Sequence, residues 1–223
     1  MDNINPNRRI KDYLKIKKSP DYSTLQRFFK RMPTDMFERI AEIIIDELNI
    51  KVEIVALDGS GFSQDTTDQY YMRIRDIKAK KYTKCHIFID IRSRLILHSQ
   101  ALNGARHDLT FANAALRKIK KYKPKFILAD KAYDLEKVRA IIHEELNAQE
   151  HILIKEKCKK GFYRKRIRKT FQKEIYNQGS HVESVFSVMK RKFSGVNKSK
   201  SVRLINKETR VKTLIYTYTG LFN

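Results

Sequence analysis

The sequence is poor in cysteine, with only Cys85 and Cys158, and it has no tryptophan. The two cysteines lie far apart and neither belongs to a CxxC pair, which excludes a disulfide framework and a zinc ribbon. We therefore expect two reduced thiols, one of them buried. The six histidines show no HExxH or similar spacing, so any catalytic metal ion should have oxygen ligands.

Acidic residues are scarce relative to basic ones: 25 Asp and Glu stand against 48 Lys and Arg, for a formal net charge of +23. A content of 41% hydrophobic and 10% aromatic residues over 223 positions is typical of a folded domain of ordinary size. A folded protein with this excess of positive charge is expected to bind a polyanion. Nucleic acid is the first candidate and a membrane surface is the rival.

Long apolar runs are also missing. No stretch approaches the length of a bilayer span, and the first residues, "MDNINPNRRIKDYLK", lack the apolar segment of a signal peptide. The sequence thus predicts a cytoplasmic protein with no membrane partner.

The first fifty residues have a helical pattern. One short helix is predicted between Ser19 and Pro33, and a second over residues 34–49. We interpret residues 1–50 as a short basic helical N-terminal segment. It is either a remnant of a helix-turn-helix DNA-binding module or a plain pair of helices packed ahead of a sheet.

From residue 51 the pattern changes to strands. Three apolar or β-branched runs follow one another, and the two-residue gap "RS" between the second and third indicates a hairpin. The runs are "EIVALDGSGFS", "TKCHIFIDI" and "RLILHSQAL".

Helices and strands then alternate. A helix capped by Asp108, the strand "KFILAD", a helix capped by Asp134 and the strand "HILIK" complete the order βββαβαβ, and further helices follow. Because a β-α-β unit favours a right-handed parallel crossover, residues 51–223 are predicted to form an α/β domain. Its mixed sheet should carry helices on both faces.

Residues 155–173, "KEKCKKGFYRKRIRKTFQK", contain ten Lys or Arg and one acidic residue. Such a run could be a solvated linker. Aromatic residues lie among the charges, however, and this favours base or sugar stacking beside phosphate contacts. The cations from which we expect DNA binding are Arg164, Lys165, Arg166 and Arg168.

Three carboxylates stand at positions where a site could form. Asp58 interrupts the first strand, Asp130 follows the fourth, and Glu183 lies in the first turns of a helix whose apolar stripe is Val182, Phe186, Met189 and Phe193. A structural alternative exists for each of them, and for Asp130 it is a place near the N-terminus of the next helix. Asp58–Gly59 is a strong turn signal, and Ser180-x-x-Glu183 matches a capping box. Asp134 is the better cap for its helix, which leaves Asp130 without an obvious local role.

The first and fourth strands can be neighbours in a mixed sheet, which would bring Asp58 and Asp130 together under the helix that carries Glu183. Carboxylates this close repel each other unless a cation lies among them, and Mg²⁺ or Mn²⁺ suits such oxygen ligands. Two such ions, about 3.5–4 Å apart, would activate an attacking oxygen and stabilise the leaving oxygen in phosphodiester displacement.

The order Asp, Asp, Glu on this core resembles the RNase H-like catalytic domain of DDE transposases. Transposases of prokaryotic insertion sequences have segments similar to "ALDGSGF", "ILADKAYD" and "NQGSHVESVFSVMKRKF", and the resemblance covers roughly residues 51–222. In a large branch of that family the catalytic Glu belongs to a Tyr-x2-Arg-x3-Glu-x6-Lys signature. Tyr176, Glu183 and Lys190 match three of its positions, and Gly179 occupies the Arg position.

The resemblance implies a metal-dependent enzyme that cleaves DNA at the ends of an insertion sequence and joins them to target DNA. Asp58, Asp130 and Glu183 would be the catalytic metal ligands, while Tyr176 and Lys190 would place the DNA. We expect double-stranded DNA as partner, a homodimer on that DNA, and association with the nucleoid. The alternatives are an RNase H-like nuclease without strand transfer and a decayed or domesticated copy that only binds DNA.

Overall fold

The computed structural model describes residues 11–12, 14–64, 74, 82–104, 109–158 and 160–220, without the side chains of residues 109–111. By its internal contacts the chain divides into two compact units, Met1–Met36 and Phe37–Asn223.

The smaller unit contains helix α2 (Tyr22–Arg31), which confirms the first predicted helix. The Asp21 carboxylate caps its start by accepting a hydrogen bond of 2.7 Å from the backbone N–H of Tyr22. The helix ends ahead of Pro33, where the Met32 N–H donates to the Phe28 carbonyl. None of its residues is buried. A DNA-binding role for this segment stays a prediction.

The second predicted helix is α3 (Asp35–Glu47), and most of it belongs to the larger unit. The sequence predicts a boundary at residue 50, whereas the contacts divide the chain at residue 36. Phe37 and Ile45 are buried, and Ile45 joins the core beneath the sheet. Glu38 forms ion pairs with Lys118 and Arg210, which tie α3 to two helices of the larger unit.

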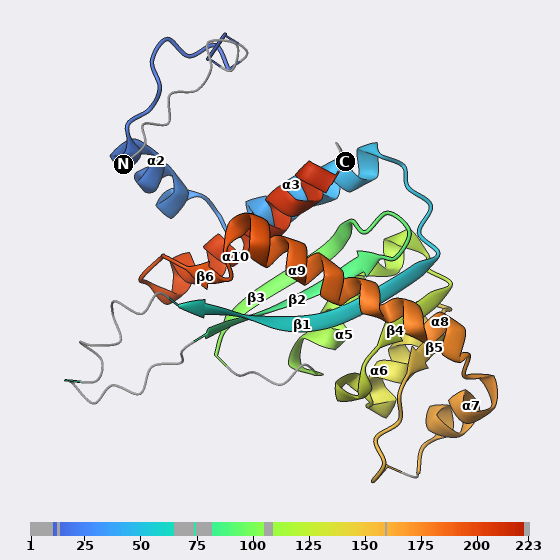
Figure 1. Cartoon of the computed structure of the whole chain (residues 1–223). Helices are drawn as coiled ribbons and strands as arrows, with labels where there is room; N and C mark the ends of the chain where they lie inside the picture. Colours follow the sequence, from blue (N-terminus) through green and yellow to red (C-terminus); the bar gives the residue numbers. More distant parts are fainter. Residues whose placement is uncertain are drawn as a thin grey trace. The chain divides into compact units, whose positions relative to one another are not determined.

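One six-stranded mixed sheet forms the centre of the larger unit (Figure 1). Five strands lie in the order β3-β2-β1-β4-β5, and the short β6 pairs with the far end of β1. β1 is antiparallel to β2 and parallel to β4, β2 and β3 are antiparallel, and β4 and β5 are parallel. The strands are β1 (Ile54–Gln64), β2 (Tyr82–Asp90), β3 (Ile96–Asn103), β4 (Phe126–Ala129), β5 (Gln149–Ile152) and β6 (Val196–Asn197).

Helices cover both faces of this sheet (Figure 1). Between the strands lie α5 (Leu109–Ile119) and η1 (Lys120–Tyr122), then η2 (Lys131–Tyr133), α6 (Glu136–Ala140) and the π-helix η3 (Ile141–Glu145). After β5 come α7 (Phe162–Thr170), α8 (Lys173–Asn177), η4 (Gln178–Ser180), α9 (His181–Phe193) and α10 (Val202–Thr219). The βββαβαβ order with following helices is therefore confirmed. The unit has the RNase H-like arrangement of a mixed sheet flanked by helices.

Alternation along the strands separates two hydrophobic cores. In β1, Val55 and Leu57 face the core shared with α5, α6 and η3, whereas Ala56 and Phe62 face the core shared with α9. Side chains of a strand alternate between the two faces of the sheet, and strands β1 to β4 each contribute to both cores. The same rule decides which face each polar residue of the strand meets.

Some local predictions differ from the structure. The hairpin between β2 and β3 has a longer connection, residues 91–95, where the Asp90 carboxylate accepts hydrogen bonds from the N–H and hydroxyl of Ser93. Asp108 lies outside the described residues. Both cysteines are free; Cys85 is buried, and burial raises the pKa of its thiol to about 12.

Candidate active site

Asp58 and Asp130 lie side by side at one edge of the sheet. In the parallel pairing of β1 with β4, Leu57 stands opposite Ala129, so Asp58 is the next residue of β1 and Asp130 is the first residue after the end of β4. Because side chains alternate, Asp58 shares a face with Ala56 and Phe62, and this is the face that packs against α9. The prediction that the two aspartates stand on neighbouring strands is confirmed.

The Asp58–Gly59 pair does not form a turn. β1 continues through it to Gln64, and Gly59 pairs with His86 on β2. A side chain at residue 59 has no room, because a Cβ atom there would lie 2.7 Å from Cε1 of His86. The absence of a side chain at this position therefore makes room for the His86 ring of the neighbouring strand.

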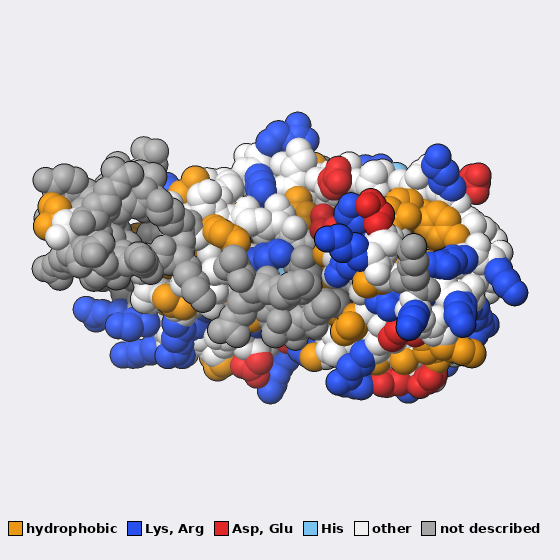
Figure 2. Space-filling view, turned by 90° about the horizontal axis from the view of Figure 1, so that it is seen from below, with side chains coloured by type: hydrophobic (Ala, Val, Ile, Leu, Met, Phe, Trp, Pro, Cys, Tyr) orange, Lys and Arg blue, Asp and Glu red, His pale blue; other side chains and the backbone are white. Residues whose placement is uncertain are grey.

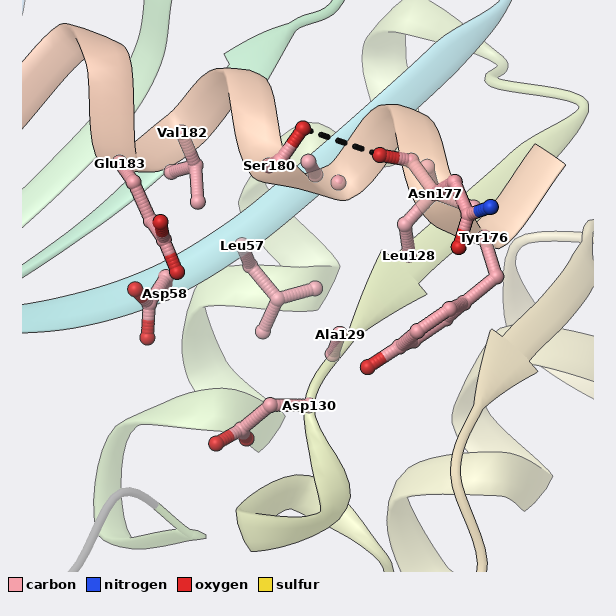
Figure 3. A pocket seen from close by; sticks show the side chains of 12 residues that line it. Leu57, Asp58, Leu128, Ala129, Asp130, Tyr176, Asn177, Ser180, Val182 and Glu183 are labelled. Atoms are coloured by element: carbon pink, nitrogen blue, oxygen red, sulfur yellow. Dashed lines mark hydrogen bonds between the residues drawn. The ribbon is translucent and has the colours of Figure 1, made fainter. Parts of the chain in front are cut away.

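Glu183 reaches the same place from α9. A pocket of about 270 Å³ is lined by Asp58, Asp130, Tyr176, Gly179 and Glu183, among others. Figure 3 shows the Glu183 side chain extending from the helix toward Asp58, while the Tyr176 hydroxyl points into the space beside Asp130. The structure thus brings together three carboxylates that are distant in the sequence.

The capping-box alternative for Glu183 fails in the structure. Ser180 has helical backbone angles because η4 runs directly into α9, and its side chain makes no cap hydrogen bond to α9. Its hydroxyl donates instead to the carbonyl of Asn177, at 3.0 Å. Glu183 is exposed, and the described residues include no hydrogen-bond or ion-pair partner for it. Its carboxylate is therefore available in the pocket.

Asp130 does have a local role, contrary to the prediction from the sequence. Its Oδ1 accepts a hydrogen bond of 2.9 Å from the Ala132 N–H and so caps η2. Asp134 does not cap α6, whose N-cap is Leu135. Asp134 is buried instead and pairs with Arg139 and Arg164. Asp130 therefore lines the pocket with one carboxylate oxygen, Oδ1, engaged in the cap hydrogen bond.

Two further residues of the signature lie near the carboxylates. Burial raises the pKa of the Tyr176 hydroxyl, and the negative charges of Asp130 and Glu183 raise it further, so the hydroxyl stays protonated. The Lys190 ammonium donates a hydrogen bond of 2.8 Å to the Ser60 hydroxyl and lies over the Phe62 ring. Lys190 is thus held along β1 beside the pocket and does not line it. Nothing in the sequence pattern marked Ser60 as its partner.

The donor set suits a hard divalent cation, although the side chains do not form a closed cage. Among the described residues, no group of three or more His, Cys, Asp or Glu lies close enough to hold a metal ion by itself. Mg²⁺ needs fewer protein ligands than this, because it usually keeps several waters and binds one or two carboxylates together with substrate phosphates. The carboxylates of Asp58, Asp130 and Glu183 are therefore compatible with ions that bind together with DNA.

Residues 162–170 of the basic segment form helix α7, which is docked on the core. The Glu136 carboxylate accepts hydrogen bonds from the backbone N–H groups of Tyr163 and Arg164 at the start of the helix. The Tyr163 ring stacks on the His143 ring with their centroids 4.9 Å apart, so the tyrosine ring packs against the protein itself. This part of the segment is therefore a packed helix rather than a linker.

Arg164 differs from the other cations of this helix. Its Nε donates to Asp134 Oδ1 at 2.8 Å, and its side chain is only 12% exposed. Lys165, Arg166 and Arg168 are exposed. Arg164 therefore has a structural role that the sequence did not indicate, and three of the four predicted DNA-binding cations face solvent.

Comparison with known families agrees with the fold. The family model described as "Transposase DDE domain" matches residues 51–219. The chain therefore belongs to this family of transposases, whose members act on DNA and generally use divalent metal ions. A search of curated proteins gave no match. In the described part of the chain, no helix is long and apolar enough to cross a bilayer.

Proposed function

We propose that this chain cleaves DNA at the ends of an insertion sequence and joins the resulting 3′-hydroxyl to target DNA. The observation that carries the proposal is the shared pocket of Asp58, Asp130 and Glu183, in which Asp58 lies within β1 and Asp130 directly follows the adjacent parallel strand β4. A transposase of this kind would act on chromosomal DNA in the cytoplasm, as a homodimer that joins the two ends.

The three carboxylates are proposed to hold two divalent ions, Mg²⁺ or Mn²⁺, whose chemistry is to activate the attacking oxygen and stabilise the leaving oxygen. The protein residues around them would orient the DNA. Tyr176 keeps its proton and can donate a hydrogen bond to a phosphate oxygen. Lys190, held by Ser60, supplies a positive charge beside the same phosphate.

The formal charge of +23 supports a DNA partner. Lys and Arg side chains recur across the face drawn in Figure 2, with smaller groups of acidic side chains among them. On α7, the exposed Lys165, Arg166 and Arg168 are proposed to contact phosphates of the DNA that leads to the pocket. Phe171, at the end of this helix, lies against Tyr176, which connects α7 to the pocket.

The test is Glu183→Gln, with Asp58→Asn and Asp130→Asn as parallel variants. Each change keeps the shape of the side chain and removes the negative charge that a divalent ion needs. We expect Mg²⁺-dependent cleavage of DNA carrying the element's end to fall at least about 100-fold, because the removed groups act directly in the reaction. Thermal stability and DNA binding should change little, since Glu183 is exposed and forms no cap.

Four outcomes of these experiments are distinguishable. Cleavage with a joined element–target product supports the transposase, whereas cleavage without joining supports a nuclease on the same fold. Near-normal cleavage by a well-folded Glu183→Gln variant would contradict the proposed site. A wild-type chain that binds DNA and never cuts it, with correct ends supplied, would instead indicate a DNA-binding protein.

A further inference from the structure

His86 and Tyr133 form a buried pair directly behind the two aspartates. His86 lies on β2 opposite Gly59, and Tyr133 ends the short helix η2 that begins after Asp130. A hydrogen bond of 3.0 Å joins Nδ1 of His86 to the Tyr133 hydroxyl, and the two rings meet edge to face. Each residue is only 2% exposed. The pair does not line the pocket.

This pair connects the two chain segments that carry the aspartates. On one side, the His86 ring lies against the backbone of Gly59, the residue next to Asp58, so closely that even a methyl group would not fit between them. On the other side, Tyr133 is three residues beyond Asp130, and its N–H donates to the Asp130 carbonyl at 3.2 Å. The hydrogen bond therefore links β1 and β2 to the turn after β4.

The direct pairing of β1 with β4 does not reach this far. The last paired residues are Leu57 and Ala129, each immediately before its aspartate. Beyond that point β1 continues as a strand while the chain after β4 turns into η2. Beyond the last strand pair, the His86–Tyr133 hydrogen bond is a further link between the two chain segments that carry the aspartates.

We propose that His86 and Tyr133 are positioning residues that set the spacing of Asp58 and Asp130 for divalent-ion binding. This inference rests on the proposed function, because it assumes that the two aspartates bind the ions together. Neither residue touches the reacting atoms. Their contribution is to keep two ligands at the separation that an ion shared with DNA phosphate requires.

The expected magnitude follows from the indirect way in which the pair contacts the proposed metal ligands. Mutating a residue that orients metal ligands typically costs about 10–100-fold in metal affinity or activity. His86 and Tyr133 act through the backbone of the ligand-bearing segments, so we expect the lower end, about tenfold. The cost should appear in the metal concentration needed, with little change in DNA affinity measured without metal.

The experiment compares Tyr133→Phe, His86→Phe and the double variant with wild type. Two quantities are measured: Mn²⁺ affinity of the protein from the electron paramagnetic resonance signal of free Mn²⁺, and the Mg²⁺ concentration for half-maximal cleavage. Tyr122→Phe is the matched control, because Tyr122 packs against the same core but precedes β4 at its other end. All variants are checked by thermal melts.

We expect each single variant to weaken Mn²⁺ binding about tenfold and to need about tenfold more Mg²⁺, with high metal restoring cleavage. Both single changes remove the same hydrogen bond between His86 and Tyr133, so their effects should not multiply. The Mn²⁺ affinity of the double variant should therefore lie within about twofold of that of the more weakly binding single variant. Tyr122→Phe should bind Mn²⁺ like wild type.

Wild-type Mn²⁺ affinity in Tyr133→Phe would overturn the inference. So would an equal loss in Tyr122→Phe, or a double variant whose loss is the product of the two single losses. The outcome for Asp58→Asn is read separately. If that variant also binds Mn²⁺ and cleaves like wild type, the proposed metal site fails; if it is inactive while Tyr133→Phe is normal, only the positioning role fails.

Discussion

Helix α7 allows a quantitative test of how the protein binds DNA. Lys165, Arg166 and Arg168 are exposed on this helix, whereas Arg164 is bound to Asp134. We therefore predict that replacing the three exposed cations with Gln weakens DNA binding and its dependence on salt. Replacing Arg164 with Gln should leave that dependence unchanged and reduce stability instead.

The size of the effect follows from counterion release. Each lost phosphate contact makes the slope of log K against log salt shallower by about 0.9, so three contacts change it by about 2.7. Between 50 and 200 mM salt, wild-type affinity should then fall roughly 40-fold more than that of the triple variant. Two contacts would still give a change of about 1.8, which a salt series resolves.

The Arg164→Gln variant is the matched control within the same helix. It removes one positive charge, as each of the three changes does, but its partner Asp134 is buried. Loss of a hydrogen bond to a charged group costs about 1.5–3 kcal/mol, which lowers the melting temperature by roughly 3–12 °C in a domain of this size. Asp134 keeps its pairing with Arg139, so the fold should survive.

The assay is fluorescence anisotropy of a labelled duplex over a series of salt concentrations without divalent metal. A slope in the triple variant equal to that of wild type would refute the assignment of α7 as a DNA contact. A shallower slope in Arg164→Gln, with unchanged stability, would refute the structural role of Arg164.

Two further predictions concern His98 and Gly179. Burial, helped by the Lys118 charge and partly opposed by Glu38, lowers the pKa of His98 to about 4. The unfolded state therefore binds more protons than the folded state between pH 6.5 and 4. Acidification through this range should cost up to about 3 kcal/mol of folding stability. Denaturant titrations at a series of pH values should show a smaller loss in His98→Gln. At Gly179, a Cβ atom would make only an ordinary 3.8 Å contact with Leu128. We expect Gly179→Arg to melt within about 2 °C of wild type and to steepen the salt slope of DNA binding by about 0.9; a strongly destabilised variant would contradict this view of the pocket.

Local sequence patterns were sufficient to predict the fold and the face on which the site forms. The alternation of Ala56, Asp58 and Phe62 in β1 places the aspartate on the face toward α9, and a period of two is a property of any strand. The helical spacing of Val182, Phe186 and Met189 likewise buries one side of α9, with Glu183 next to it. These relations hold between residues close in the chain, so they could be inferred without coordinates.

The tertiary structure decided which residues are free to act. Arg164 and Lys165 are neighbours of the same charge, yet one pairs with Asp134, thirty residues earlier, and the other is exposed. Residue 59 has no room for a side chain, because the His86 ring of the next strand lies against its backbone. Such contacts join residues that are far apart in the sequence. They form only when whole helices and strands pack together, so a local sequence pattern does not predict them.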